Sequence, residues 1–171
     1  GEAPGVQSWT PMGSGSHPYT GTFDGNGYTI SGVYINTTAD GQGLFGYVGN
    51  GGTVQNLGVI NSFVSGGTYV GGVAGRNYGG TIQNCYNAGF VTGSVQYVGG
   101  VTGYNRIGMV QNCYNIGSVT GTKCVGGVAG ENHRDGGGRM KKYSNAGSVS
   151  GELYVDSVSG YSIINGAITN C

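Results

Sequence analysis

The sequence is short of charge, proline and long apolar runs, and each shortage excludes a class of protein. Charged residues make up 8% of the 171-residue chain, and seven Lys and Arg balance seven Asp and Glu. A net charge of zero gives no support to nucleic acid or an anionic membrane surface as a partner. No run of about 18 apolar residues is present, so no membrane insertion is predicted. With three prolines and 37% hydrophobic residues, the chain has the material for a folded core rather than a disordered linker.

Residues for catalysis and metal binding are also scarce. The two histidines, His17 and His133, lie in no catalytic motif, and the cysteines form no CxxC pair. We therefore expect no cofactor and no zinc site. Glu131 and Asp135 stand close together but in one loop, whereas glycoside hydrolysis needs two carboxylates separated across a cleft. No catalytic residue is predicted, and we expect that the chain is not an enzyme.

Glycine is abundant, and it recurs with apolar residues at regular intervals. The chain has 40 glycines, and residues 69–93 are followed by a near copy, residues 97–121. Because Gly adopts positive φ without steric cost, this spacing predicts a chain that turns repeatedly. Four apolar positions recur: first Leu44, Val73, Val101, Val128 and Val158; second Val54, Ile82, Val110, Met140 and Ile168; third Leu57, Cys85, Cys113, Tyr143 and Cys171; fourth Val64, Val91, Val119 and Val149.

The repeat predicts a fold. Successive residues of the second apolar position are 28 or 30 residues apart. Short β-branched segments at this period predict an all-β, parallel β-solenoid whose coils bury their apolar faces against one another. We expect about five coils of 27–30 residues, right-handed like nearly all parallel crossover connections. Residues 1–22 are predicted to be an irregular N-terminal lead that caps the array, and residues 23–171 to be the repeat domain, a fragment of a larger protein.

Several motifs resemble a known family. Gly43-Leu44-Phe45-Gly46 matches the short GLUG motif, and the Val-Gly-Gly-Val-Ala-Gly and Gln-Asn-Cys-Tyr-Asn elements are similar to repeats of GLUG-containing bacterial surface proteins. That family includes adhesin-like proteins and non-catalytic regions of IgA-specific metallopeptidases. The resemblance implies an extracellular or cell-surface location in bacteria and a role in adhesion or as a stalk or spacer. It transfers no catalytic residue.

Basic residues interrupt the repeat and form a predicted binding edge. Four arginines fall between the first and second apolar positions of their coils, and two lysines follow, so we expect them to line one edge of the rod. The set is Arg76, Arg106, Arg134, Arg139, Lys141 and Lys142. A host or matrix glycan or protein would bind there, and neighbouring domains of the same polypeptide are the other expected partners. The alternative is that solvent-facing loops simply carry these charges. The second functional hypothesis is a carbohydrate-binding or carbohydrate-active domain.

Polar, aromatic and sulfur-containing residues recur at the same period. The asparagines are expected to form ladders of amides at the corners, because Asn tolerates turn conformations. The tyrosines are expected to stack for packing, with a sugar platform as the alternative. The cysteines are expected to be free thiols, because in-register stacking gives poor disulfide geometry. The residues concerned are Asn56, Asn84, Asn112 and Asn170; Asn87, Asn115 and Asn145; Tyr69 with Tyr97 and Tyr86 with Tyr114; and Cys85, Cys113, Cys124 and Cys171.

Overall fold

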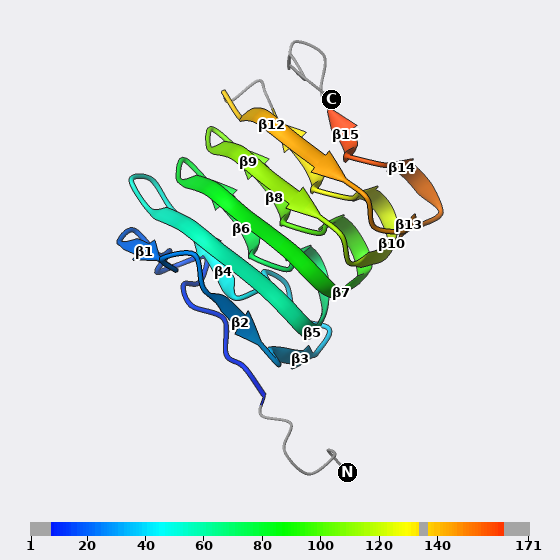
Figure 1. Ribbon diagram of the computed structural model, residues 1–171. Coiled ribbons are helices and arrows are strands. Elements are labelled where there is room, and N and C mark those ends of the chain that lie inside the picture. The colour runs from blue at the N-terminus through cyan, green and yellow to red at the C-terminus, as the bar shows by residue number, and fades with distance from the viewer. Residues whose placement is uncertain (1–7, 134–136, 163–171) are drawn as a thin grey trace.

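The computed structural model describes residues 8–133 and 137–162, and this part of the chain is an all-β parallel solenoid of about five coils without a helix (Figure 1). Both the fold class and the coil number predicted from the repeat are confirmed. The strands are β1 (Thr22–Asp24), β2 (Thr29–Ser31), β3 (Tyr34–Asn36), β4 (Phe45–Val48), β5 (Thr53–Gly71), β6 (Ala74–Tyr78), β7 (Thr81–Gly99), β8 (Thr102–Arg106), β9 (Met109–Asn115), β10 (Ser118–Gly126), β11 (Ala129–His133), β12 (Arg139–Asn145), β13 (Val149–Ser150), β14 (Leu153–Asp156) and β15 (Ser159–Ser162).

The strands form two parallel sheets. The ten-stranded sheet contains β1, β2, β3, β5, β7, β9, β10, β12, β13 and β14, and the five-stranded sheet has the order β15-β11-β8-β6-β4. Strand β5 pairs in turn with β1, β2 and β3, so one long strand covers the length of three short strands in the first coil. Each coil therefore crosses the ten-stranded sheet, turns, and returns through the five-stranded sheet, with β1 and β15 at opposite ends of the stack (Figure 1).

The core is a stack of apolar rows in register. In the second predicted row, Val54 pairs with Ile82, Ile82 with Val110, and Val110 with Met140, and all four are at most 1% exposed. The other three predicted rows are also in register, although Val149 and Val158 at their ends are only partly buried. Ile168 of the second row and Cys171 of the third lie outside the described residues. A fifth buried row, which was not predicted from the repeat, consists of Val70, Val98 and Val125.

The corners explain the repeated asparagines and glycines. Asn56, Asn84, Asn112 and Lys142 occupy one corner position and have φ between 48° and 55°. This left-handed region is unfavourable for most L-residues, and Asn enters it more readily because its short polar side chain bonds locally. At Gly99, the Cβ of any other residue would overlap the carbonyl oxygen of Thr102, so the close approach of two segments there requires glycine.

The described part of the lead packs onto the first coil. Met12 forms a parallel bridge with Phe45, and Tyr19 forms one with Val48. The Trp9 Nε1–H donates to the Leu44 carbonyl oxygen over 3.0 Å, and Trp9, Met12 and Tyr19 all pack against the core. Residues 8–21 thus run along β4 and cover the edge of that strand that does not pair with β6. They therefore lie beside the outer surface of the five-stranded sheet.

Candidate functional site

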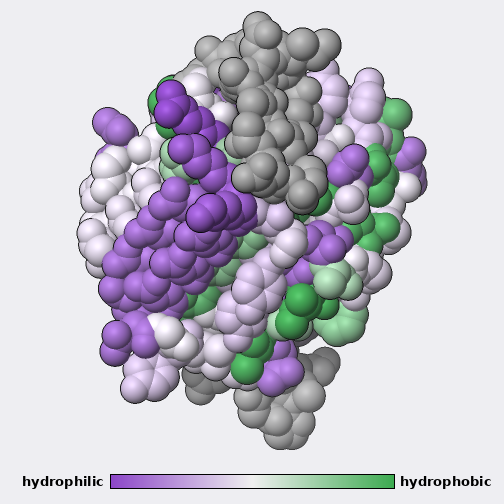
Figure 2. Space-filling view, turned by 45° about the horizontal axis from the view of Figure 1, so that its top comes forward, coloured by the Kyte–Doolittle hydropathy of each residue, from purple (hydrophilic) through white to green (hydrophobic). Residues whose placement is uncertain are grey.

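The outer surface of the ten-stranded sheet carries two ladders of side-chain amides. Gln111 donates from Nε2 to Gln83 Oε1, and Gln83 donates to Gln55 Oε1, each over 2.6 Å. Beside them, Asn112 donates to Asn84 over 3.1 Å and Asn84 to Asn56 over 2.9 Å. We call these six residues the amide face. Figure 2 shows one side of the molecule on which hydrophilic residues gather in a continuous band.

Charged residues lie at both ends of the amide face. Gln55 and Asn56 donate to the two carboxylate oxygens of Asp24 over 2.7 and 2.9 Å. The bond from Asn56, then the Asn26 backbone N–H and Gln55, lower the pKa of Asp24. At the other end Lys141 is in register with Gln111, and Lys142 follows it. Because every amide N–H₂ of the two ladders is directed toward Asp24, the aligned dipoles favour an anion there and cations at the lysine end.

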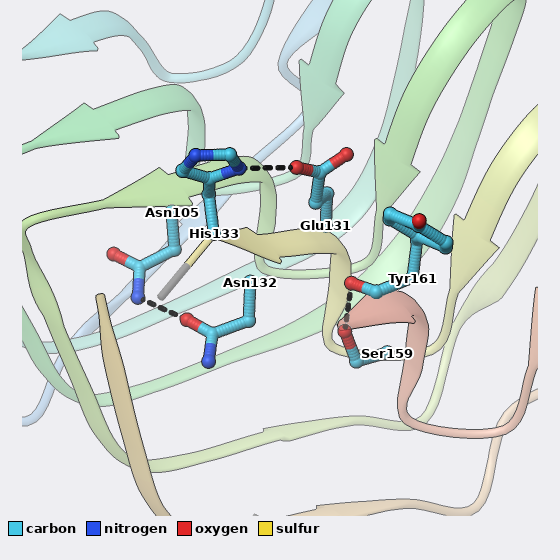
Figure 3. Close-up of polar contacts among 6 residues, drawn as sticks. All are labelled: Asn105, Glu131, Asn132, His133, Ser159 and Tyr161. Carbon is cyan, nitrogen blue, oxygen red and sulfur yellow. Dashed lines mark hydrogen bonds and ion pairs between the residues drawn. The ribbon is translucent and has the colours of Figure 1, made fainter. Parts of the chain in front are cut away.

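Two further asparagine ladders are buried, except at the partly buried Asn145, and run in the opposite direction. Asn87 donates to Asn115 and Asn115 to Asn145, each over 2.8 Å. The asparagine ladders predicted from the repeat are therefore confirmed for their described members, whereas Asn170 lies outside the described residues. A third series was not predicted: Asn77 donates to Asn105 over 2.9 Å. Asn105 in turn donates to Asn132 over 2.8 Å, as Figure 3 shows. Its members, all at most 1% exposed, each follow the first apolar position by four residues, which is a signal visible in the sequence.

The outer surface of the five-stranded sheet is built from unlike residues. Side chains on both sides of the buried Asn77, Asn105 and Asn132 point outward, because successive residues of a strand face opposite sides. In register, one row reads Tyr47, Arg76, Tyr104, Glu131 and Tyr161, and the other reads Tyr78, Arg106 and His133. We call Tyr47, Arg76, Tyr78, Tyr104, Arg106, Glu131 and His133 the arginine face. Its two arginines come from adjacent coils.

Aromatic rings surround Arg76. Its guanidinium carbon lies 5.3 Å from the ring centre of Tyr69, 5.1 Å from that of Tyr78 and 5.5 Å from that of Tyr104. Arg106 lies over the same Tyr78 ring at 5.8 Å. Tyr69 also stacks on Tyr97 at 5.4 Å with the rings 7° from parallel, which confirms that predicted stack. These contacts are within the range of cation–π attraction and hold the Arg76 side chain in place.

The two arginines have no carboxylate partner among the described residues. Within residues 8–133 and 137–162, the only ion pair joins Glu131 Oε1 and His133 Nδ1 at 2.9 Å (Figure 3), so no described carboxylate lies within 4.0 Å of either guanidinium. The Nε atoms of Arg76 and Arg106 are buried and have no hydrogen-bond acceptor among the residues that the structure describes. Glu131 lies in β11 and is only 4% exposed, so the sequence-based expectation that it belongs to a loop is wrong.

The tyrosines of this surface do not neutralise the arginines. Burial raises the pKa of Tyr47, with Arg76 acting in the opposite direction. Burial and the nearby Glu131 charge raise the pKa of Tyr104, and they raise that of Tyr97 to about 12. All three side chains are therefore neutral phenols at physiological pH, and the positive charge of Arg76 and Arg106 remains.

A pocket of about 500 Å³ opens beside the two arginines, between the lead and the arginine face. Its wall combines two cations, two phenol rings, two neutral hydrogen-bonding side chains, and apolar or small residues; the lining is Arg76 and Arg106, Tyr47 and Tyr78, Thr20 and Asn50, and Gly15, Pro18, Val48 and Gly49. The two guanidinium groups beside hydrogen-bonding groups suit a small anion that also carries apolar surface.

The structure divides the predicted binding edge into two groups. Arg76 and Arg106 are brought together at the pocket. Arg139, Lys141 and Lys142 are exposed on β12 of the ten-stranded sheet, where the two lysines continue the positions of the amide ladders. Arg134 lies outside the described residues. The chain turns from one sheet to the other between Arg106 and Met109, so residues before and after that corner belong to different surfaces.

The described cysteines offer no reactive thiolate. Cys85, Cys113 and Cys124 are free and buried. The hydrogen bond with Cys113, together with burial, raises the pKa of Cys85, and burial raises that of Cys124 to about 11. The part of the chain that the structure describes holds no group of three His, Cys, Asp or Glu side chains suited to a metal ion, and no helix long and apolar enough to cross a membrane.

These features define a tandem-repeat β-solenoid whose coils are joined by polar ladders. The GLUG motif matches residues 66–92, which run from β5 through β6 into β7, so the motif predicted from the sequence is present, although in a later coil than Gly43-Leu44-Phe45-Gly46. The chain is 39% identical over 80 residues to a "Putative Gly-rich membrane protein" of Evansella cellulosilytica, covering 44% of this chain and 9% of that protein.

A second relative is "Halomucin" of Haloquadratum walsbyi, 45% identical over 60 residues, with 34% of this chain and 1% of that protein covered. The chain therefore spans less than a tenth of the length of each of these curated relatives. No solved structure matches this chain.

Proposed function

We propose that this chain is a non-enzymatic repeat domain of a bacterial cell-surface protein and that it acts in adhesion. The cell-surface location is supported by the names of the two relatives, a membrane protein and halomucin, and by the low charge of the chain. The observation that carries the adhesive role is the arginine face. A domain that served only as a stalk would need the ladders and the core, but not two adjacent arginines that have no carboxylate partner among the described residues and lie beside a pocket.

The chemistry of the described residues supports a binding role over a catalytic one. Glu131 is buried, contacts His133 and is not among the residues that line the pocket, so the pocket itself is lined by no described carboxylate. The pKa values of the buried Cys85 and Cys124 thiols are raised, whereas a nucleophilic cysteine needs a lowered pKa. Arginine, tyrosine and asparagine at the pocket are suited to recognition.

The test is a screen of the purified chain, coupled to beads, against glycans and matrix proteins. Adhesion predicts retention by at least one ligand class, and loss of retention in the Arg76→Gln/Arg106→Gln double variant. The matched control is Lys141→Gln/Lys142→Gln, which removes the same charge from β12. Retention that depends on the lysines and not on the arginines would contradict the assigned surface, and a chain that binds nothing would be a spacer.

A carbohydrate-binding role at a different surface is the second candidate. Tyr86 and Tyr114 stack at 4.8 Å with rings 2° from parallel, which confirms that predicted pair. A depression of about 400 Å³ beside them is lined by Asn56, Asn84 and Tyr86. Neutral sugars commonly lie against aromatic rings flanked by amides, so Tyr86→Ala should abolish retention by neutral oligosaccharides if this surface is used. Retention unchanged in that variant would exclude it.

A further inference from the structure

We propose that the pocket beside Arg76 and Arg106 binds the carboxylate of an acidic sugar, such as a hexuronic acid residue. This inference rests on the proposed adhesive function and names the ligand class of its surface. Three observations support it: the charge of the pocket, the fixed position of Arg76, and the absence of a free strand edge.

The charge comes first, because both guanidinium groups lie at the pocket and no described carboxylate lies within 4.0 Å of either. The only described ion pair uses Glu131 with His133, so that carboxylate is already bound. A guanidinium binds a carboxylate with two parallel hydrogen bonds, and two adjacent guanidinium groups make one carboxylate the natural ligand.

Arg76 is also held in position before a ligand arrives. The rings of Tyr69, Tyr78 and Tyr104 surround its guanidinium at 5.1 to 5.5 Å. A side chain already restricted by its neighbours loses little conformational freedom on binding, which favours affinity. Arg106 shares the Tyr78 ring, so that one tyrosine sets the relative position of the two cations.

The remaining walls favour a sugar over an acidic peptide. Thr20, Asn50 and the phenol hydroxyl of Tyr47 are groups that hydrogen-bond to sugar hydroxyls, and the volume of about 500 Å³ is within the range of small-ligand sites. Peptides commonly bind by pairing with a free strand edge. Here β4 pairs with β6 on one side and is bridged by Met12 and Tyr19 of the lead on the other, so the pocket offers no such edge.

The experiment compares D-glucuronate with D-glucose, which share a ring and differ in the carboxylate, by calorimetric titration of the full chain. We expect glucuronate to bind at least tenfold more tightly than glucose. Arg76→Gln and Arg106→Gln should each weaken glucuronate binding at least fivefold, while the binding of glucose stays unchanged. The control Lys123→Gln removes the same charge from an exposed position on β10 and should change neither affinity.

Other results would overturn the proposal. Equal affinity for glucose and glucuronate, or unchanged binding in both arginine variants, contradicts the carboxylate subsite. A tetraglutamate peptide that binds more tightly than glucuronate contradicts the sugar assignment. If circular dichroism shows that an arginine variant does not fold, the wild-type chain still tests the proposal. Its affinity for glucuronate must fall with added NaCl, and its affinity for glucose must not.

The failure of this subsite differs from the failure of adhesion. If glucuronate does not bind but the bead screen finds a ligand whose retention is lost on mutation of another surface, the adhesive function is supported and the carboxylate subsite is contradicted. If neither glucuronate nor any screened ligand binds, both proposals are contradicted.

Discussion

The amide face and the arginine face belong to the same coils but are built by opposite rules. On the amide face, identical residues repeat in register, so each amide donates to the one before it and the series ends on Asp24. On the arginine face the register rows are mixed, and Arg76 and Arg106 are left without a carboxylate partner among the described residues. Repetition satisfies hydrogen bonds within the stack, whereas departure from repetition leaves charge available to a ligand.

The difference follows from what stacking in register does to each side-chain type. An amide has both a donor and an acceptor, so a row of identical amides bonds to itself. A guanidinium has only donors, so a row of identical arginines would repel and leave every donor unused. The arginines are instead placed beside tyrosines in adjacent coils, which accept them through cation–π contacts and do not remove their charge.

The largest effect on stability should come from the buried ladder directly behind the arginine face. Asn105→Ala removes donations to Asn132, to the Gly108 carbonyl and to the Arg139 carbonyl. Because Asn105 is fully buried, its former partners are left unsatisfied, and we expect a loss of about 3 kcal/mol in the free energy of unfolding. Urea denaturation measures it, and a loss below about 1 kcal/mol would show that the buried ladder is not needed.

A smaller loss is expected on the amide face. Asn84→Ala breaks two exposed amide bonds and places alanine at φ 52°, so we expect about 2 kcal/mol. Asn84→Gly breaks the same amide bonds, but glycine tolerates this φ, so its loss in the free energy of unfolding should be about half that of Asn84→Ala. The difference between the two variants measures the contribution of the backbone conformation. Equal losses in the two variants would mean that the conformation contributes nothing and that only the amide bonds matter.

The Asp24 end of the amide face predicts a pH dependence. Because the folded-state pKa of Asp24 is lowered by its hydrogen bonds, its stabilising contribution is present above the unfolded pKa of about 3.9 and is lost as pH falls through the folded pKa. The urea midpoint of the wild type should therefore drop more between pH 6 and pH 2.5 than that of Asp24→Asn. Glu152→Gln, at an exposed carboxylate, should behave like the wild type. An identical drop in all three chains would contradict the stabilising role of Asp24 at the end of the ladders.

The smallest effect on stability is expected at the arginine face. Arg106→Gln removes one cation–π contact but also a buried Nε–H that has no acceptor among the described residues. The two changes offset, and the net change in the free energy of unfolding should be within about 1 kcal/mol. Arg106 and Asn105 are adjacent in β8, so this pair compares scaffold and surface on one strand. A loss at Arg106 as large as that at Asn105 would mean that the arginine is a structural residue.

The repeat in the sequence predicted most of the fold but less of the candidate site. Apolar rows, asparagine ladders and tyrosine stacks could be predicted because identical residues at a fixed period must meet in a stack. Asn77, Asn105 and Asn132 obey the same rule and could have been found by their constant offset from Val73, Val101 and Val128. The predicted edge did group Arg76 with Arg106. Their register partners, Tyr104 and Tyr78, could not be predicted, because the two arginines stand at different offsets in the repeat.

The central claim is that the ladders hold the solenoid and the arginine face binds an acidic ligand. Mapping backbone amide chemical shifts of the wild-type chain during titration with D-glucuronate tests it most directly. The expected shifts cluster at Tyr47, Asn50, Tyr78 and Arg106, are absent from Gln83 and Asn84, and do not occur with D-glucose. Shifts that cluster on the amide face instead, or that glucose reproduces, would contradict the claim.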